Sequence, residues 1–166
     1  MKTELLCLSF TAGLLAQKID VEFDQGIDFS KYKTFSIREG QIHSKHPSLN
    51  NDLIKKRIES EIHKRLTAKG LTKVSERPDL NVRYSLGSAS KREVESYPAG
   101  WRGRGVRRVA VRYTEGTLVI DLRDPTTRSL VWRAVAIEDK RDPSQLPNRL
   151  DEMVKKSFDK YPPKKK

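Results

Sequence analysis

Alternating hydrophobic and polar residues mark the strands of this chain. In residues 18–24, Ile19, Val21 and Phe23 alternate with aspartate and glutamate. This period of two predicts a half-buried β-strand, because successive side chains of a strand point to opposite faces. The same reasoning predicts further strands at the end of residues 29–35 and over residues 80–86, 109–113, 118–122 and 130–137.

The last two of these strands are expected to form a hairpin. The segment between them begins Asp124-Pro125-Thr126-Thr127. Aspartate at the first position and proline at the second suit a type I turn. In this hairpin Trp132 lies across from strand 118–122, where its burial would contribute roughly 2–3 kcal/mol. Asp121 is expected on the opposite face, either as a surface residue or as a partner for Arg133.

Two stretches show no period and are predicted to be loops. Residues 38–50 and residues 87–108 are polar and contain glycine and proline, which interrupt regular structure. Glu115-Gly116 is expected to break the strand that follows the second loop, with Gly116 relieving a bend before the hairpin.

Apolar residues at helical spacing predict a first helix over residues 51–69. Isoleucine or leucine recurs every four residues from Ile54 to Leu66, and lysine and arginine occupy the other face. Asn50 or Asn51 can cap the first turn, and Gly70 is expected to take the left-handed conformation that commonly ends a helix.

A second helix is predicted over residues 144–160, with Asp142 and Asp151 near its start. The elements together predict an α+β fold: an antiparallel or mixed sheet of about five to six strands with two helices packed on one face. The length of 166 residues is that of one domain. We assign residues 17–161 to that domain and residues 162–166 to a basic tail.

The first sixteen residues predict export. Leu5 to Ala16 is mainly apolar and follows the single positive charge of Lys2. The stretch is too short to span a bilayer and suits the hydrophobic region of a signal peptide that is cut near Ala16. We therefore expect a periplasmic or outer-envelope protein whose mature chain has no transmembrane span. A buried N-terminal strand or helix is the alternative.

Cys7 is the only cysteine and lies within this segment. Cleavage would leave a mature protein without a thiol, which excludes a disulfide framework. Glu4-Leu5-Leu6 lacks the small residues expected before an acylated cysteine, so lipid anchoring at Cys7 is not expected.

Several short motifs, taken in order, resemble a known family. The motifs are Asp28-Phe29-Ser30-Lys31-Tyr32-Lys33-Thr34-Phe35, Leu66-Thr67-Ala68-Lys69-Gly70-Leu71, Arg77-Pro78-Asp79-Leu80, Tyr113-Thr114-Glu115-Gly116-Thr117-Leu118-Val119-Ile120-Asp121 and Leu130-Val131-Trp132-Arg133. Together they resemble the domain of unknown function 4136 family of bacterial envelope proteins, many of which are lipoproteins. The resemblance implies an exported α+β sandwich with two helices, and no established catalytic residues. The chain departs from the family in lacking a convincing lipid-attachment cysteine and in crowding a central loop with arginine.

The charge of the chain favours anionic partners. Lysine and arginine exceed aspartate and glutamate by 34 to 22, which gives a net charge of +12. Arginine forks match phosphate and carboxylate groups, and tryptophan can stack on a ring or sit at a lipid interface. The candidate anion-binding residues are Trp101, Arg102, Arg104, Arg107, Arg108, Lys91, Arg92 and Arg112. The simpler alternative is a solvated loop in a basic protein.

No arrangement of residues predicts catalysis, a metal or a cofactor. His43, His46 and His63 lack the three or four converging ligands that a metal site needs. The serines lack the Gly-x-Ser-x-Gly frame of a nucleophile, and Asp121 and Asp124 are expected on opposite faces of the sheet. We therefore do not expect an enzyme.

The leading hypothesis is an envelope-associated binding or structural module whose basic loop contacts anionic lipid, acidic glycan or an envelope protein. A nucleic-acid-binding protein is the alternative, and a hydrolase with an unrecognised site is a third.

Overall fold

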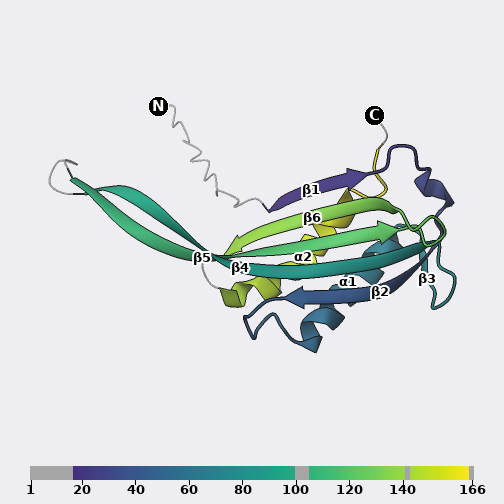
Figure 1. Ribbon diagram of the computed structural model, residues 1–166, viewed down its shortest axis with the longest axis horizontal. Coiled ribbons are helices and arrows are strands. Elements are labelled where there is room, and N and C mark those ends of the chain that lie inside the picture. The colour runs from purple at the N-terminus through teal and green to yellow at the C-terminus, as the bar shows by residue number, and fades with distance from the viewer. Residues whose placement is uncertain (1–16, 100–104, 141–142, 165–166) are drawn as a thin grey trace, which may run out of the picture.

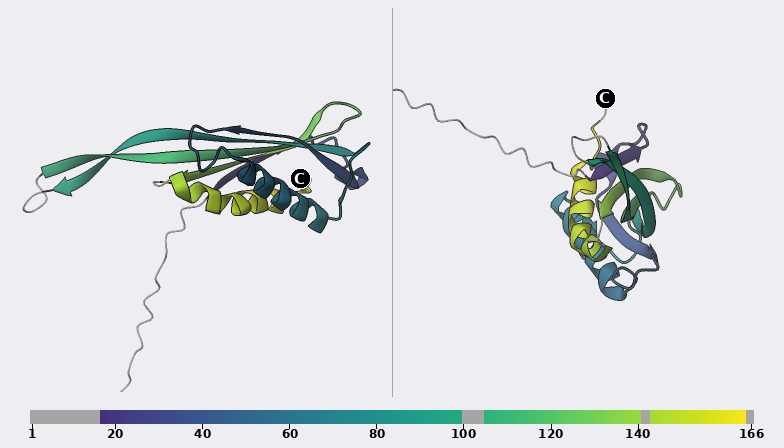
Figure 2. Two further views of the ribbon diagram at one scale, coloured as in Figure 1. Left: turned by 90° about the horizontal axis from the view of Figure 1, so that it is seen from below. Right: turned by 90° about the vertical axis from the view of Figure 1, so that its left-hand side faces the viewer.

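The chain forms two layers, a mixed β-sheet and a pair of helices that cover one face of it (Figures 1 and 2). The computed structural model describes residues 17–99, 105–140 and 143–164, with the backbone alone for residues 39, 89–99, 105–114, 140 and 143. The helices are α1 (Asp52–Ala68) and α2 (Leu146–Asp159). The strands are β1 (Lys18–Phe23), β2 (Thr34–His43), β3 (Thr72–Lys73), β4 (Leu80–Ala99), β5 (Gly105–Arg123) and β6 (Leu130–Lys140).

The six strands of the described chain are ordered β1-β6-β5-β4-β2-β3. The pairs β1–β6, β6–β5 and β5–β4 are antiparallel, whereas β2 runs parallel to both β4 and β3. Parallel neighbours need a crossover connection, and α1 supplies it between β2 and β4. The predicted α+β class, the mixed sheet and the placing of both helices on one face are confirmed.

The predicted ends of α1 are confirmed by its capping. The Asn51 side chain accepts a hydrogen bond from the Ile54 amide (3.1 Å). At the other end Gly70 has a φ of +88°. The Gly70 amide donates to the Thr67 carbonyl (2.9 Å) and the Leu71 amide to the Leu66 carbonyl (3.1 Å). This pair of bonds is the Schellman motif, which satisfies the last free carbonyls of the helix.

The second helix begins slightly later than predicted. A 3-10 turn, Pro143–Gln145, precedes α2. Asp151 is nevertheless the sixth of the 14 residues of α2, so it lies inside the helix and not at its start. Its carboxylate accepts hydrogen bonds from Arg57 Nε (2.7 Å) and Arg57 Nη2 (2.9 Å) of α1, which tie the two helices together.

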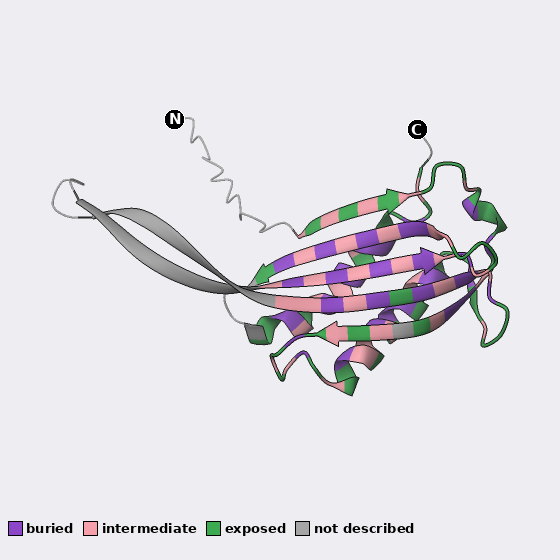
Figure 3. Cartoon of the chain, viewed as in Figure 1, coloured by how far each residue is buried: buried purple, intermediate pink, exposed green. Residues whose placement is uncertain are grey.

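The hydrophobic core lies between the sheet and the helices. Strands β4, β5 and β6 alternate buried and half-buried residues, as expected where one face is covered and the other is open (Figure 3). Trp132 is fully buried, lies opposite Leu122 and stacks on Phe158 of α2 at a ring separation of 5.4 Å. Tyr161 meets the Trp132 ring edge-on at 5.7 Å. The predicted hairpin and the burial of Trp132 are confirmed.

Three predictions about strand limits are wrong. Residues 38–43 are not loop, because β2 continues to His43 beside β4 through a bulge between Ile37 and Glu39. Residues 87–99 and 105–108 are not an irregular loop, because β4 runs on to Ala99 and β5 starts at Gly105. Glu115-Gly116 does not break β5. A β-carbon at Gly116 would lie 2.9 Å from Leu146 Cδ2, so close packing of α2 explains this glycine better than a bend.

The extended part of β4 and β5 forms a two-stranded arm. We define the arm as residues 91–99 of β4 and 105–113 of β5, which pair only with each other. At about 3.4 Å per residue, nine residues carry it roughly 30 Å beyond the sheet. Figures 1 and 2 show it leaving the helix-covered body. No helix and no third strand lies beside the arm in these views, so its sequence needs no strict alternation, and the period of two was visible only over residues 109–113.

Candidate functional site

Five of the eight candidate anion-binding residues lie on the arm. Trp101, Arg102 and Arg104 lie outside the described residues. The other five lie on the strands of the arm: Lys91 and Arg92 on β4, and Arg107, Arg108 and Arg112 on β5. The candidate patch is therefore carried on paired backbone instead of the loop that the sequence suggested.

The register of the arm divides these five residues between its two faces. Directly paired residues share a face, and successive residues alternate. Arg92 pairs with Arg112, and Arg108 pairs with Ser96 on the same face. We call this the arginine face; its positions are Arg92, Val94, Ser96, Pro98, Val106, Arg108, Ala110 and Arg112, and none is acidic.

The other face of the arm has balanced charge. It carries Lys91 and Arg107, together with Glu93 and Glu95. We call this the mixed face. The five described residues are therefore divided between the two faces of the arm: three arginines share one face, and two cations lie on the other.

The pairing of Arg92 with Arg112 contrasts with a row of charges in the body of the sheet. There the register sets five charged residues side by side across five strands with alternating sign: Glu22, Arg133, Asp121, Arg83 and Glu39. Opposite charges across strands stabilise a sheet, and like charges directly opposite destabilise it by a few tenths to about 1 kcal/mol. The register of the arm, in contrast, sets two residues of like charge directly opposite each other.

The centre of this charged row is a two-pronged ion pair. Arg133 donates from Nε to Asp121 Oδ1 (2.7 Å) and from Nη2 to Asp121 Oδ2 (2.8 Å). These hydrogen bonds raise the pKa of Arg133 above its usual value. Of the two alternatives that the sequence left open, Asp121 is thus the partner of Arg133.

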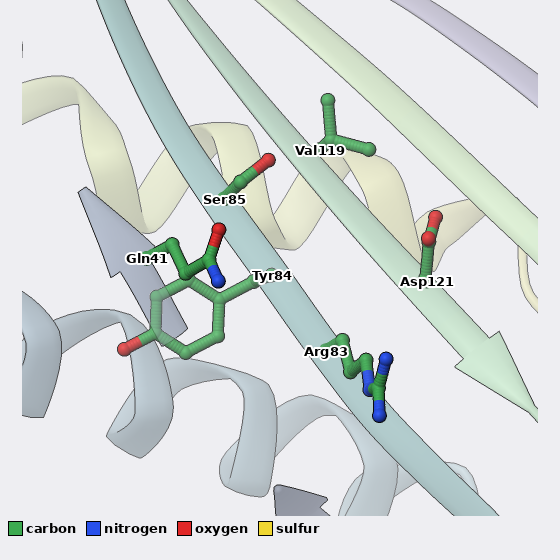
Figure 4. Close-up of a pocket in the computed structure, with 6 residues that line it drawn as sticks. All are labelled: Gln41, Arg83, Tyr84, Ser85, Val119 and Asp121. Atoms are coloured by element: carbon green, nitrogen blue, oxygen red, sulfur yellow. The ribbon is translucent and has the colours of Figure 1, made fainter. Parts of the chain in front are cut away.

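A shallow depression of about 170 Å³ lies on the open face of the sheet, the face away from the helices (Figure 4). Arg83, Ser85 and Gln41 bring polar groups to it, and Val119 adds an apolar side. Asp121 also lines the depression, but both of its carboxylate oxygens already accept hydrogen bonds from Arg133. The depression can hold a small polar group and lacks the depth to enclose a ligand.

Tyr84 reaches this region from the helix side and fixes the neighbouring strand. Its hydroxyl donates to Glu59 Oε1 (3.0 Å) and lies 3.4 Å from the Lys55 carbonyl. Burial is the main reason that the pKa of Tyr84 is raised, and the hydrogen bond to Glu59 adds to it. The ring passes so close to Gly40 that a β-carbon there would lie 2.0 Å from Tyr84 Cζ.

A larger hollow of about 470 Å³ lies at the end of the sheet opposite the arm. Its wall includes Tyr32, Asp79 and Asp124. Tyr32 donates its hydroxyl to Asp124 Oδ2 (3.2 Å), and Lys31 Nζ lies 3.9 Å from the same oxygen. Asp124 Oδ1 accepts from the Thr126 amide at 2.8 Å.

These contacts hold both carboxylates of the hollow ionised. Burial alone would raise the pKa of Asp124, but hydrogen bonds from Thr126, Thr127 and Tyr32, together with the charge of Lys31, outweigh it and lower the pKa. Asp79 Oδ2 accepts from the Lys33 amide, the Thr34 amide and the Thr34 hydroxyl, each at 2.9 Å. The Lys33 amide is the largest cause of the lowered pKa of Asp79.

Sequence reasoning missed this hollow. Tyr32 and Asp124 are 92 positions apart, so no local spacing joins them. The one available signal was that two quoted motifs, residues 28–35 and 77–80, both supply its wall. The carboxylates of the hollow accept hydrogen bonds from backbone amides and from Tyr32. They therefore connect the start of β2 with the start of β4 and with the β5–β6 turn, and we call this cluster the latch.

The histidines do not come together. His43 contacts Gln41 (3.2 Å), His46 contacts Ser48 (2.6 Å), and the His63 ring lies 6.1 Å from that of Phe35. Across residues 17–99, 105–140 and 143–164, no three metal-ligating side chains are grouped. None of the helices in these ranges is both long and apolar enough to cross a membrane.

The fold and the arm define a class of protein: a two-layer α+β module with a projecting two-stranded arm. The chain belongs to the family described as Domain of unknown function (DUF4136), whose family model matches residues 19–163. This confirms the resemblance seen in the sequence motifs.

A solved structure supports the fold. A PDZ domain protein from Parabacteroides distasonis is 20% identical with a TM-score of 0.60, over 90% of this chain and 36% of that chain. The chain thus spans little more than a third of that protein. The PelC dodecamer from Paraburkholderia phytofirmans is 13% identical with a TM-score of 0.49, over 86% of this chain and 95% of that chain. Comparison with curated proteins gave no match.

Proposed function

We propose that this protein is an exported, envelope-associated binding module that contacts anionic components of the envelope through its arm, and that it is not an enzyme. The observation that carries the proposal is the arm itself. It pairs with no other strand of the described chain and carries five of the predicted basic residues. An isolated two-stranded ribbon is marginally stable in water, so an arm of this length gains stability from a surface to lie on.

The hydrogen bonds that hold Asp121, Asp79 and Asp124 in place support binding over catalysis. General acid–base chemistry needs a titratable group that is free to exchange a proton with a substrate. In the described part of the chain, Asp121 is held by Arg133, and Asp79 and Asp124 are held by backbone amides. Each group serves the fold.

The apolar stretch from Leu5 to Ala16 supports export. It lies outside the described residues, and the first strand begins at Lys18. Cleavage near Ala16 would leave every described strand and helix intact. Lipid attachment at Cys7 is not part of the proposal.

Cell fractionation with N-terminal sequencing of the recovered protein tests this proposal. We expect a chain that begins near Gln17, recovered with the periplasm or with membranes, and released from membranes by salt. Recovery of the uncleaved chain from the cytosol would contradict export and, with it, an envelope partner.

A further inference from the structure

We infer that the arginine face of the arm binds an anionic lipid surface, and that the mixed face does not take part. This inference rests on the proposed function and names its partner and contact residues. It concerns Arg92, Arg108 and Arg112, and it distinguishes the two faces of the arm, which the sequence alone does not separate.

The register of the arm divides its charged residues unequally between the two faces. The arginine face carries three arginines and no carboxylate, whereas the mixed face carries two cations and two carboxylates. An anionic surface is therefore attracted to one face of the arm and is nearly indifferent to the other.

Arg92 and Arg112 occupy directly opposite positions on the two strands of the arm. Like charges at such positions destabilise the pairing of the strands. A phosphate that binds there, and accepts charge-assisted hydrogen bonds from arginine, would offset this cost. The pairing is unfavourable in the free protein and favourable in the complex, as expected of a binding site.

The uncharged positions of the arm favour a lipid surface over a soluble polyanion. They include Val94, Pro98, Val106 and Ala110 on the arginine face, and Tyr97, Val109, Val111 and Tyr113 on the mixed face. At a membrane, lipid phosphates would bind the arginines while neighbouring aliphatic residues enter the boundary of the acyl chains. A soluble glycan or nucleic acid would use the charges alone, and only the difference in charge separates the two faces.

Spacing along the strand suits several separate head groups. Arg112 and Arg108 are four positions apart on β5, which is about 14 Å along an extended strand. The arm therefore has two arginine positions at one point along its length and a third about 14 Å further on, which suits a second head group.

Two variants of equal charge test the inference. One is Arg92→Ser with Arg112→Ser on the arginine face, and the matched control is Lys91→Ser with Arg107→Ser on the mixed face. The probe is vesicles of phosphatidylcholine with about one third phosphatidylglycerol, measured by co-sedimentation of the full chain at low salt. The N-terminal apolar segment is common to all variants, so its contribution cancels in the ratios.

Each cation near an anionic membrane contributes roughly fivefold to affinity. We therefore expect the Arg92→Ser, Arg112→Ser variant to bind about 25-fold more weakly and the control to bind within about threefold of the unchanged protein. Both variants should keep the thermal midpoint of the parent to within a few degrees. Vesicles of phosphatidylcholine alone should bind all three proteins equally.

The other outcomes overturn the inference in distinct ways. Equal weakening by both variants would mean that the arm binds by net charge without a preferred face, which leaves the proposed function standing. Binding to an acidic polysaccharide or an oligonucleotide, with no binding to the vesicles, would replace the lipid by a soluble polyanion. Vesicle binding that neither variant weakens would remove the arm from the proposed function.

Discussion

Replacing Gly40 by alanine tests how tightly Tyr84 locks β2 to the body of the sheet. A β-carbon at residue 40 would lie 2.0 Å from Tyr84 Cζ and 2.1 Å from its hydroxyl oxygen. These separations are far below van der Waals contact, so the ring must move. The backbone of Gly40 does not have a positive φ, so the whole effect comes from the collision.

The ring of Tyr84 has little room to yield. The residue is 97% buried, with a relative exposure of 3%, and its hydroxyl donates to Glu59. Overpacking of this kind costs typically 1–3 kcal/mol. For a domain of this size that corresponds to a fall of roughly 4–8 °C in the thermal midpoint, taking about 2 kcal/mol.

Gly87→Ala is the matched control. Like Gly40, Gly87 lies within a strand, in this case β4. The nearest atom to its added β-carbon would be the Thr117 carbonyl oxygen at 3.9 Å. We expect this variant to be as stable as the parent or slightly more stable, because alanine restricts the unfolded chain. Urea unfolding of both variants measures the difference.

Combining Gly40→Ala with Tyr84→Ala tests whether the collision causes the loss of stability. Gly40→Ala should destabilise the protein less when Tyr84→Ala has already removed the ring, so the two changes should be strongly non-additive. Additive effects, or an equal loss of stability in Gly40→Ala and Gly87→Ala, would show that the collision is not what requires glycine at residue 40.

Two further predictions concern the latch and the core. Asp79→Ala should lower the free energy of unfolding by about 1–3 kcal/mol at pH 7, because three donors lose their acceptor. Since the pKa of Asp79 is lowered in the folded state, its contribution is present above the ordinary carboxyl pKa and is lost as the pH falls below it. Urea titrations at pH 7 and pH 3 should therefore show a smaller gap between parent and variant at pH 3; a constant gap would contradict an ionic role. Trp132→Ala should cost about 3–5 kcal/mol, because it removes a fully buried ring stacked on Phe158, and a loss below about 1 kcal/mol by thermal unfolding would contradict its place in the core.

The sequence predicts the parts of this fold that have one buried and one open face. Strand residues 18–23 and 80–86, and the hairpin around Asp124, show a period of two because alternate side chains enter the core. Helix α1 was predicted to within one or two residues because Asn51 and Gly70 have specific roles at its ends.

The end of β2, the arm and its two faces could not be predicted, because they depend on strand pairing between residues distant in sequence. Residues 38–43 form a strand only because β4 lies beside them. The arm has no face that the core demands, so only its residues 109–113 showed a strand pattern and the rest looked like a loop. The division of its basic residues into two faces follows from a register that the sequence does not reveal.

The central claim is that the arm is the binding element of this module, and removing the arm tests it most directly. Ala89 and Glu115 are paired across β4 and β5, so an Asn-Gly turn can join them in place of residues 90–114. The shortened protein keeps α1, α2 and the core, and we expect it to unfold cooperatively within a few degrees of the parent. Its affinity for anionic vesicles should fall by at least 100-fold at low salt, to the level seen with phosphatidylcholine alone. A folded, armless protein that still binds anionic vesicles as tightly as the parent would contradict the account.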